Sequence, residues 1–399
     1  MIAERDNKIK IAVDPGFDSV KVVINGYAFK FPKEVIDITS LKENQFIGEK
    51  KDSYLKVNYI PGKSHLIGEY AARLLDETGK GREDLERVSI SDTFATFESA
   101  DKEVLIMGAI AKALIEYAKQ DKSEMLVFRE GEDGFDLKSG AVDIYVCIAL
   151  PHDAEEHEWE YISRWLKGEH KYSIETNEGK FNFDIRTDKI THASQVLAAL
   201  YGVISDDEGR MDKSDEMLSE SSLPSIVIDG GYLTLGRARF TSVKIVDGGT
   251  SDQKYAMRNI YEAVAKTIRE EYGREDITSS NIKRIMENTK TLNYSVDGKG
   301  ATLDVSKLVA EESKKTCEAL INELKEMYNN LFDIKTLIIT GGTGMVYYKE
   351  ITKLLKDSCP WIKVILTDYE FKGEKISPDY AIAVGSYKVL SHFVELSKK

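Results

Sequence analysis

The sequence contains one short pattern twice, near the start of each half: an apolar strand that runs into an acidic residue and glycine. Residues 9–24 read IKIAVDPGFDSVKVVI, with Asp14 after the first strand, and residues 225–235 read SIVIDGGYLTL, with Asp229 after the second. One such segment alone is typical of any β-hairpin with a tight turn. Two of them, in halves where strands alternate with helices, predict a pair of α/β domains.

The remaining patterns are consistent with this division. They predict strands at 8–13, 19–25, 27–32, 143–150, 172–185, 225–228, 336–339 and 363–366, and helices at 102–119, 153–166, 194–201, 257–268, 305–331 and 379–393. A polar loop is expected at 129–140, and the acidic, serine-rich residues 206–222 indicate a connection between domains. In the 305–331 helix, one stripe is expected to face the core: Leu320, Leu324, Met327, Tyr328 and Leu331. We assign residues 1–205 plus 378–399 to one domain and 206–377 to the other.

Both acidic turns carry groups of the kind that can bind phosphate and a divalent cation. Two such hairpins facing each other across a cleft can direct backbone N–H groups at opposite sides of one triphosphate. Their acids, Asp14 and Asp229, would then bracket Mg²⁺ through the water molecules that this ion retains. The candidate nucleotide-binding residues are Asp14, Gly16, Phe17, Asp18, Ser19 and Lys21 in the first turn, and Asp229, Gly230, Gly231, Tyr232 and Thr234 in the second.

A third glycine-rich turn follows an apolar strand in the segment LIITGGTGM, residues 337–345. Glycines allow close approach of the backbone to a ligand, and the helix that follows favours phosphate at its N-terminus. A dinucleotide site is the alternative, with Asp368 as the ribose acid, but its Gly-x-Gly-x-x-Gly pattern is incomplete because Tyr347 occupies the last glycine position. The candidate residues here are Gly341, Gly342, Thr343 and Gly344.

Composition and spacing exclude several other functions. The chain of 399 residues has 55 basic and 68 acidic side chains, a net charge of −13, which argues against direct nucleic-acid binding. Its three cysteines form no CxxC pair, so neither a disulfide framework nor a cysteine zinc site is expected. Because the sequence has neither a signal peptide nor an apolar run of membrane-spanning length, we expect a cytoplasmic protein without membrane contact.

Two further near-matches fail on spacing. Gly62-Lys63-Ser64 resembles the end of a Walker A loop, but the first glycine of that motif is replaced by Val57. His152 and His157 lie about 140° apart around a helix, so they cannot share a face as zinc ligands do at i and i+4.

The order of the motifs resembles the actin-like ATPase superfamily, which also includes sugar kinases and heat-shock chaperone ATPases. The segments that carry the resemblance are DPGFDSVK, IALPHDA, SQVLAALYG, DGGYLT, TGGTGM and DYAIAVGSYKV, in this order over nearly the whole chain. Within the superfamily, IGEYA at 67–71 and the hairpin segment at 165–185 look most like the ParM branch, bacterial actin-like proteins that segregate plasmids. The resemblance implies an actin-like ATPase fold, with two related ribonuclease H-like α/β domains flanking a nucleotide cleft.

The resemblance also implies roles for individual residues. Asp14, Gly16 and Lys21 match the first phosphate motif, where the lysine contacts phosphate and the acid orients the water shell of magnesium. Asp229, Gly231 and Thr234 match the second phosphate motif, and Gly341, Gly342 and Gly344 match the adenosine motif. Residues 149–152 and 381–386 match the two segments that connect the domains at the hinge.

Gln195 and Tyr232 are the most informative positions of this comparison. The string QVLAALY from Gln195 aligns without gaps to the actin helix whose glutamine positions the attacking water, which implies a catalytic role for Gln195 beside Asp14 and Asp229. Tyr232 and Leu233 stand where the family has small residues, usually glycine and often threonine. A tyrosine beside the phosphate would require this loop to bend outward, which affects the expected γ-phosphate contacts and hydrolysis rate.

The implied function is a filament-forming ATPase that hydrolyses ATP with Mg²⁺, with GTP as an alternative nucleotide. Its expected partners are further copies of itself and a DNA-binding adaptor protein on a centromere-like site of a plasmid or phage. A non-polymerising phosphotransferase of the sugar or acetate kinase type is the alternative. Such a kinase needs an acidic base for its substrate hydroxyl, and the cleft-forming segments offer no clear candidate. A chaperone-like ATPase would be expected to carry a further C-terminal domain.

Overall fold

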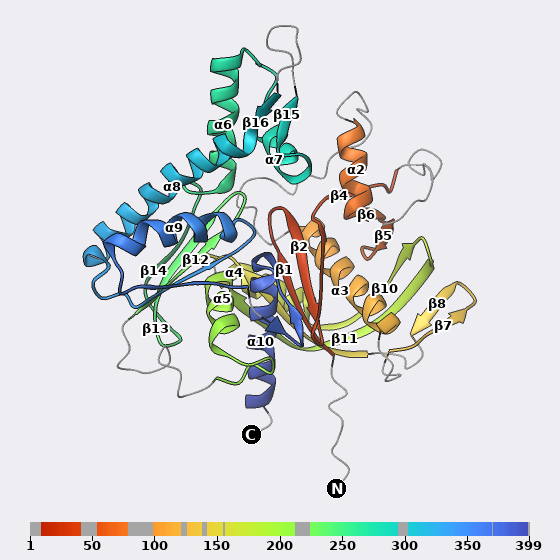
Figure 1. Ribbon diagram of the computed structural model, residues 1–399. Coiled ribbons are helices and arrows are strands. Elements are labelled where there is room, and N and C mark those ends of the chain that lie inside the picture. The colour runs from red at the N-terminus through yellow and green to blue at the C-terminus, as the bar shows by residue number, and fades with distance from the viewer. Residues whose placement is uncertain are drawn as a thin grey trace.

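The computed structural model describes residues 9–40, 54–78, 99–120, 126–137, 142–154, 156–211, 224–293, 302–368 and 370–397. Two β-sheets are formed by different halves of the chain, and helices α5 (Gln195–Ile204) and α10 (Ala381–Leu396) lie between them (Figure 1). We call the described residues of 9–194 the first lobe and those of 224–376 the second lobe.

The sheet of the first lobe is built around β1 (Ile9–Pro15). This strand pairs antiparallel with β2 (Ser19–Ile24) and parallel with β9 (Val142–Leu150). The full order is β3-β2-β1-β9-β11-β10-β5-β6-β4. The other strands of this order are β3 (Tyr27–Pro32), β4 (Val35–Asp37), β5 (Leu55–Asn58), β6 (His65–Ile67), β10 (Gly168–Thr176) and β11 (Gly179–Ser194).

The sheet of the second lobe repeats the central part of this arrangement. Its central strand β12 (Ser225–Gly230) pairs antiparallel with β13 (Leu235–Thr241) and parallel with β17 (Thr336–Thr340), and the order is β14-β13-β12-β17-β18. The outer strands are β14 (Lys244–Asp252) and β18 (Lys363–Leu366). Because β3-β2-β1-β9-β11 has the same connectivity and strand directions, the predicted pair of related α/β units is confirmed.

Alternation along the two central strands separates three of the four hydrophobic cores that the described residues form. Ile11 and Val13 of β1 face the core of the first lobe, whereas Ala12 faces a shared core between the sheets. In β12, Ile228 faces the core of the second lobe and Val227 faces the shared core. Each sheet therefore presents one face to its own helices and the other to α5 and α10.

The helices complete these layers. Helix α3 (Ala100–Gln120) covers the first sheet, and α6 (Met257–Tyr272), α8 (Val305–Met327) and α9 (Gly344–Ser358) contribute to the core of the second lobe. The remaining helical elements are α2 (Glu69–Thr78), α4 (Glu156–Leu166), α7 (Ser279–Asn288), η1 (Asn329–Leu331) and η2 (Pro378–Tyr380). The short strand pairs are β7 (Phe128–Gly131) with β8 (Gly134–Leu137), β15 (Thr291–Asn293) with β16 (Thr302–Asp304), and β19 (Glu370–Phe371) with β20 (Glu374–Lys375).

Helices α5 and α10 cross in backbone contact at Gly385. A Cβ atom at this position would lie 1.8 Å from the carbonyl oxygen of Ala198, so only glycine allows the two helices to approach this closely. Both segments that were predicted to connect the domains, 149–152 and 381–386, border the shared core, because Ala149 and Val384 are buried there. The division at 1–205 plus 378–399 and 206–377 stays a prediction.

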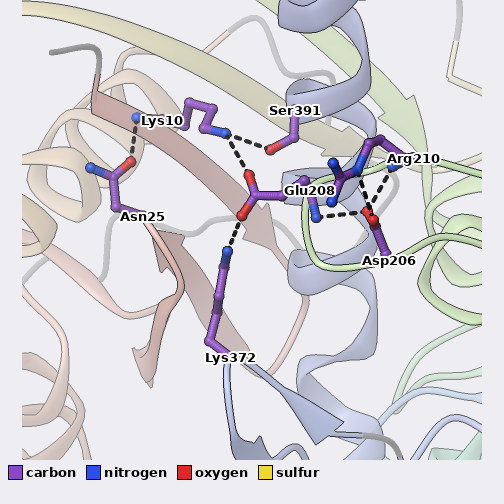
Figure 2. A network of polar contacts seen from close by, with 7 residues as sticks. All are labelled: Lys10, Asn25, Asp206, Glu208, Arg210, Lys372 and Ser391. Carbon is purple, nitrogen blue, oxygen red and sulfur yellow. Dashed lines mark hydrogen bonds and ion pairs between the residues drawn. The ribbon is translucent and has the colours of Figure 1, made fainter. Parts of the chain in front are cut away.

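An ionic network joins the lobes beside these helices. Figure 2 shows Lys10 of β1 and Lys372, from the turn between β19 and β20, reaching the carboxylate of Glu208 from opposite sides. Lys10 Nζ lies 3.7 Å from Glu208 Oε2 and donates to Ser391 Oγ of α10 at 3.0 Å. Asp206 accepts hydrogen bonds from Arg210, which fixes the turn that carries Glu208. Residues 206–211 of the expected connection thus form a turn that is held by these hydrogen bonds. Residues 212–222 lie outside the described residues.

Two sequence predictions about the fold were wrong. The expected loop at 129–140 contains the hairpin β7–β8, because Phe128 and Phe135 both pack against Phe181 of β11 at ring-centroid distances of 5.1 Å. Met327 does not belong to the buried stripe and is 45% exposed. Helix α8 ends at Met327, and Tyr328 and Leu331 take the buried positions from the turn that follows. No helix in the described ranges is long and apolar enough to span a membrane.

Candidate functional site

The three glycine turns line one cavity of about 450 Å³ between the lobes. This volume suits a small-molecule ligand. All predicted site residues except Gly344 line it: Asp14, Gly16, Phe17, Asp18, Ser19, Lys21, Gln195, Asp229, Gly230, Gly231, Tyr232, Thr234, Gly341, Gly342 and Thr343. Gly344 instead begins α9 and is buried next to Ile339 and Leu366, because the turn ends one residue earlier than predicted.

The first turn places Asp14 and Lys21 opposite each other. They are paired positions in the β1–β2 ladder, and Lys21 Nζ lies 3.7 Å from Asp14 Oδ2. Asp14 is only 2% exposed. A buried carboxylate requires a partner, and Lys21 supplies the positive charge from the neighbouring strand. The hairpin register thus explains why an acid and a lysine seven positions apart serve one site.

The second turn is held in place by the backbone of α6. Gly231 N–H donates to the carbonyl of Thr234 at 2.9 Å, which closes the turn. The carbonyl groups of Gly231 and Tyr232 accept from the N–H groups of Met257 and Arg258 at 3.3 and 2.9 Å. These N–H groups belong to the first turn of α6, where a helix has no internal acceptors for them. The carbonyl groups of the turn and the N–H groups at the start of the helix therefore satisfy each other's hydrogen bonds.

The third turn interlocks with the second. Gly341 has φ +90°, and a Cβ atom there would lie 2.4 Å from both Asp229 Oδ1 and the Gly230 carbonyl oxygen. Only glycine fits this close approach and this backbone conformation. Thr343 N–H donates to the Gly230 carbonyl at 3.1 Å. The second and third turns thus form one wall of the cavity.

The two predicted metal-binding acids differ in their electrostatics. Burial, together with the negative charge of Asp14, raises the pKa of Asp229 to about 7, and Lys21 opposes this only in part. A buried carboxyl group whose proton affinity is raised by a neighbouring carboxylate is a suitable environment for a divalent cation. Among the described residues, no group of three or more His, Cys, Asp or Glu side chains could hold a metal directly. The donor set fits Mg²⁺, which keeps several of its waters and takes few protein ligands.

Gln195 lies at the junction of strand and helix beside this pair. It is the first residue of α5, directly after β11, and the side chain of Ser194 caps the helix by accepting from Leu197 N–H at 3.3 Å. Gln195 Nε2 donates to Asp14 Oδ1 at 3.4 Å. The amide therefore enters the cavity next to an acid from the first turn, where it could hold a water molecule.

Tyr232 is part of the cavity wall, with its ring directed toward helices α6 and α7. Its ring centroid lies 6.3 Å from that of Tyr261, and Lys283 Nζ lies 4.8 Å from the Tyr232 centroid. The ring thus has partners on the second lobe. This packing accommodates a tyrosine at a position where a small residue was expected.

Sequence reasoning missed several lining residues. They are Lys30, Met257, Tyr261, Lys283, Glu287, Met345, Ser377, Pro378, Asp379 and Ile382. Lys30 could have been found, because the tight turn at Asn25-Gly26 fixes a register in which Lys30 faces Lys21. Its Nζ lies 2.6 Å from Asp379 Oδ2. Lys283 and Glu287 carry no local signal, since only the packing of α7 brings them to the cavity.

Neither the known protein families nor the curated proteins give a match to this sequence. Solved structures match over nearly the whole chain. The actin-like protein Alp7A has a TM-score of 0.69 at 14% identity and covers 98% of this chain and 98% of its own. The ParM of a 15-stranded filament from Clostridium botulinum has a TM-score of 0.64 at 16% identity, covering 97% and 100%.

ParM of Bacillus thuringiensis with ATP has a TM-score of 0.58 at 14% identity and covers 98% of this chain and 100% of its own. At these identities, the structural similarity shows the fold alone, because one fold can host many functions. The order of the strands, the duplicated turns and the cavity agree with the resemblance that the motifs indicated. This chain therefore has the actin-like fold, in the form found in ParM proteins and Alp7A.

Proposed function

We propose that this chain binds ATP with Mg²⁺ in the cavity between its lobes and hydrolyses it. The observation that carries the proposal is the convergence of three separate glycine turns and Gln195 on one cavity. These segments come from positions near 14, 195, 229 and 341 of the chain, so their meeting is a property of the fold. GTP is the alternative nucleotide, because nothing in the turns distinguishes the two bases.

Different residues of the cavity would have different roles in the reaction. Backbone N–H groups of the two acidic turns would bind the phosphate oxygens, and Lys21 would supply a positive charge beside them. Gln195 would orient a water molecule for attack on the γ-phosphate. Mg²⁺, held through water by Asp14 and Asp229, would neutralise charge on the phosphates. Closure of the two proposed domains, 1–205 with 378–399 and 206–377, would exclude bulk water.

We further propose that the protein polymerises with bound nucleotide and moves plasmid or phage DNA through an adaptor. Two observations support this: one similar structure is a ParM filament and another is the actin-like protein Alp7A. The net charge of −13 supports an indirect link to DNA, since a separate basic adaptor would have to bind the phosphate backbone.

Light scattering after addition of Mg-ATP tests this function. A rise followed by decay as nucleotide is consumed, with filaments visible by negative-stain electron microscopy, is the expected result. A flat trace with ADP release that depends on an added sugar or on acetate would instead identify a phosphotransferase. No binding of ATP or GTP in calorimetry would refute the proposed site itself.

A further inference from the structure

An ion pair connects the two lobes across the cavity. Asp18 lies in the first acidic turn, between β1 and β2, and Lys283 lies on α7 of the second lobe. The Lys283 ammonium contacts the Asp18 carboxylate directly. Helix α7 is fixed to its own lobe by Ile282, which is fully buried in that core. The pair therefore joins two bodies that are otherwise anchored in separate cores.

Both members of the pair line the cavity and are partly protected from solvent. The side chain of Lys283 is 26% exposed and that of Asp18 is 46% exposed. Lys283 has two further neighbours, the ring of Tyr232 beneath it and Glu287 Oε1 at 3.8 Å. Burial alone would lower the pKa of Lys283, but its hydrogen bond and charge interaction with Asp18 raise the pKa overall. Lys283 is thus a charged group held in one place.

Asp18 lines the cavity, as expected, but its negative charge is unfavourable for phosphate at this position. Its neighbours Gly16, Phe17 and Ser19 form a turn that we propose to bind phosphate, and a carboxylate there repels phosphate oxygens. A lysine from the opposite lobe cancels that repulsion only while the lobes are together. The charge of Asp18 therefore makes phosphate binding depend on the position of the second lobe.

We propose that Asp18 and Lys283 form a latch that holds the lobes together over the phosphate end of the cavity. The proposal rests on the nucleotide function above and deepens it: Lys283 is a positioning residue that acts through Asp18. Parting of the lobes breaks the pair, exposes the phosphates to the charge of Asp18 and so speeds nucleotide release. The latch couples lobe closure to the retention of a triphosphate.

A double-mutant cycle on nucleotide release tests the latch. The variants are Asp18→Asn, Lys283→Met and the double variant, with the release rate of a fluorescent ATP analogue measured by stopped flow. Lys283→Met should speed release about two- to fivefold, the range for one partly exposed ion pair. Asp18→Asn should have a smaller effect, because it removes the repulsion together with the latch. The double variant should match Asp18→Asn, since Lys283 has no role without Asp18.

A distance measurement tests the same latch without nucleotide. The native cysteines Cys147, Cys317 and Cys359 are buried, so spin labels can be directed to Glu69→Cys on α2 and Glu270→Cys on α6. These helices stand on opposite sides of the gap between the lobes in Figure 1. Both single latch variants should lengthen or broaden the label–label distance. If ATP does not bind at all, the proposed nucleotide function is wrong. The distance measurement still tests the latch in that case, because it needs no nucleotide.

Lys314→Met is the matched control, because Lys314 is an exposed lysine of the second lobe that pairs within its own helix with Glu318 at 3.9 Å. It should leave both the release rate and the distance unchanged. Additive effects of Asp18→Asn and Lys283→Met on release would overturn the latch, since Lys283 would then act on nucleotide directly. An unchanged distance in both single variants would overturn it as well.

Discussion

Gln195 donates a hydrogen bond from Nε2 to Asp14 Oδ1 at 3.4 Å, although 181 positions separate the two residues in the chain. Asp14 is the next-to-last residue of β1 in the first sheet, and Gln195 begins the helix that runs between the two sheets. The contact places a neutral amide beside the acid of one phosphate turn. In this arrangement the amide can hold a water molecule without adding charge to the site.

Replacing Gln195 by alanine should separate binding from hydrolysis. The turns that would hold the nucleotide remain, so affinity for ATP should stay within about threefold of the wild type. Hydrolysis should slow by about 10- to 100-fold, because the attacking water loses its orientation. Phosphate release measures the rate, and light scattering should report longer-lived polymers. Gln253→Ala, at an exposed glutamine outside the cavity, is the control. Wild-type turnover in the Gln195 variant would remove this residue from the mechanism.

The pKa of Asp229 predicts an unusual pH dependence of stability. Because burial and Asp14 raise this pKa to about 7, the folded protein holds a proton that the unfolded chain releases near pH 4. The free energy of unfolding should therefore fall as the pH rises from about 4 to about 7 and should level off above that. Asp229→Asn should lack this fall and be more stable at pH 8 by on the order of 1 to 4 kcal/mol.

Urea unfolding without ligand at pH 5 and pH 8 checks this prediction. Asp333→Asn, at an exposed acid of the second lobe, should follow the wild-type profile. Equal stability differences between the Asp229 variant and the wild type at the two pH values would contradict the raised pKa.

The same carboxyl should control magnesium. Protonation of Asp229 below about pH 7 removes one of the two charges that would hold the ion, so the gain in ATP affinity from Mg²⁺ should shrink between pH 8 and pH 6. Asp229→Ala should weaken magnesium-dependent turnover at every pH. Isothermal titration calorimetry of ATP with and without Mg²⁺ measures the gain in affinity at each pH. If the gain in ATP affinity from Mg²⁺ does not depend on pH in the wild type, Asp229 is not the group responsible.

The sequence predicted the parts of this site that are local. Asp14 and Asp229 could be found because each follows an apolar strand and is itself followed by a glycine within two positions, and the pairing of Lys21 follows from hairpin geometry. Lys283 could not be found, because its place at the cavity depends on how α7 packs against α6. The hairpin at 128–137 was missed for a similar reason: Phe128 and Phe135 are stabilised by Phe181, which is distant in the sequence.

Gly341→Ala should disrupt the wall formed by the second and third turns. The new Cβ atom would lie 2.4 Å from Asp229 Oδ1 and from the Gly230 carbonyl oxygen, and alanine disfavours a φ of +90°. We expect a loss of about 1 to 3 kcal/mol in unfolding free energy. Gly342→Ala is the matched comparison, because no atom lies within 4 Å of its added Cβ and its φ is not positive. Similar melting temperatures for both variants would show that the turns are not interlocked as described.

Glu208→Gln should weaken the attachment of the lobes beside α5 and α10. Its carboxylate binds Lys10 and Lys372 together (Figure 2), so the amide loses two charge interactions at once. Because these side chains are partly exposed, the unfolding free energy should fall by only about 1 kcal/mol, and 1 M salt should remove most of the difference.

Lys372→Met should have almost no further effect once Glu208 has been replaced, because the lysine acts through this carboxylate. Urea unfolding of both single variants and of the double variant, at low and at high salt, measures this coupling. Glu318→Gln on α8 is the control, since its pair with Lys314 lies within one helix and should give a smaller loss. Full additivity of Glu208→Gln and Lys372→Met would mean that the two lobes are held together here by packing around Tyr387 and Phe371, whose rings meet at 5.7 Å, rather than by the ionic network.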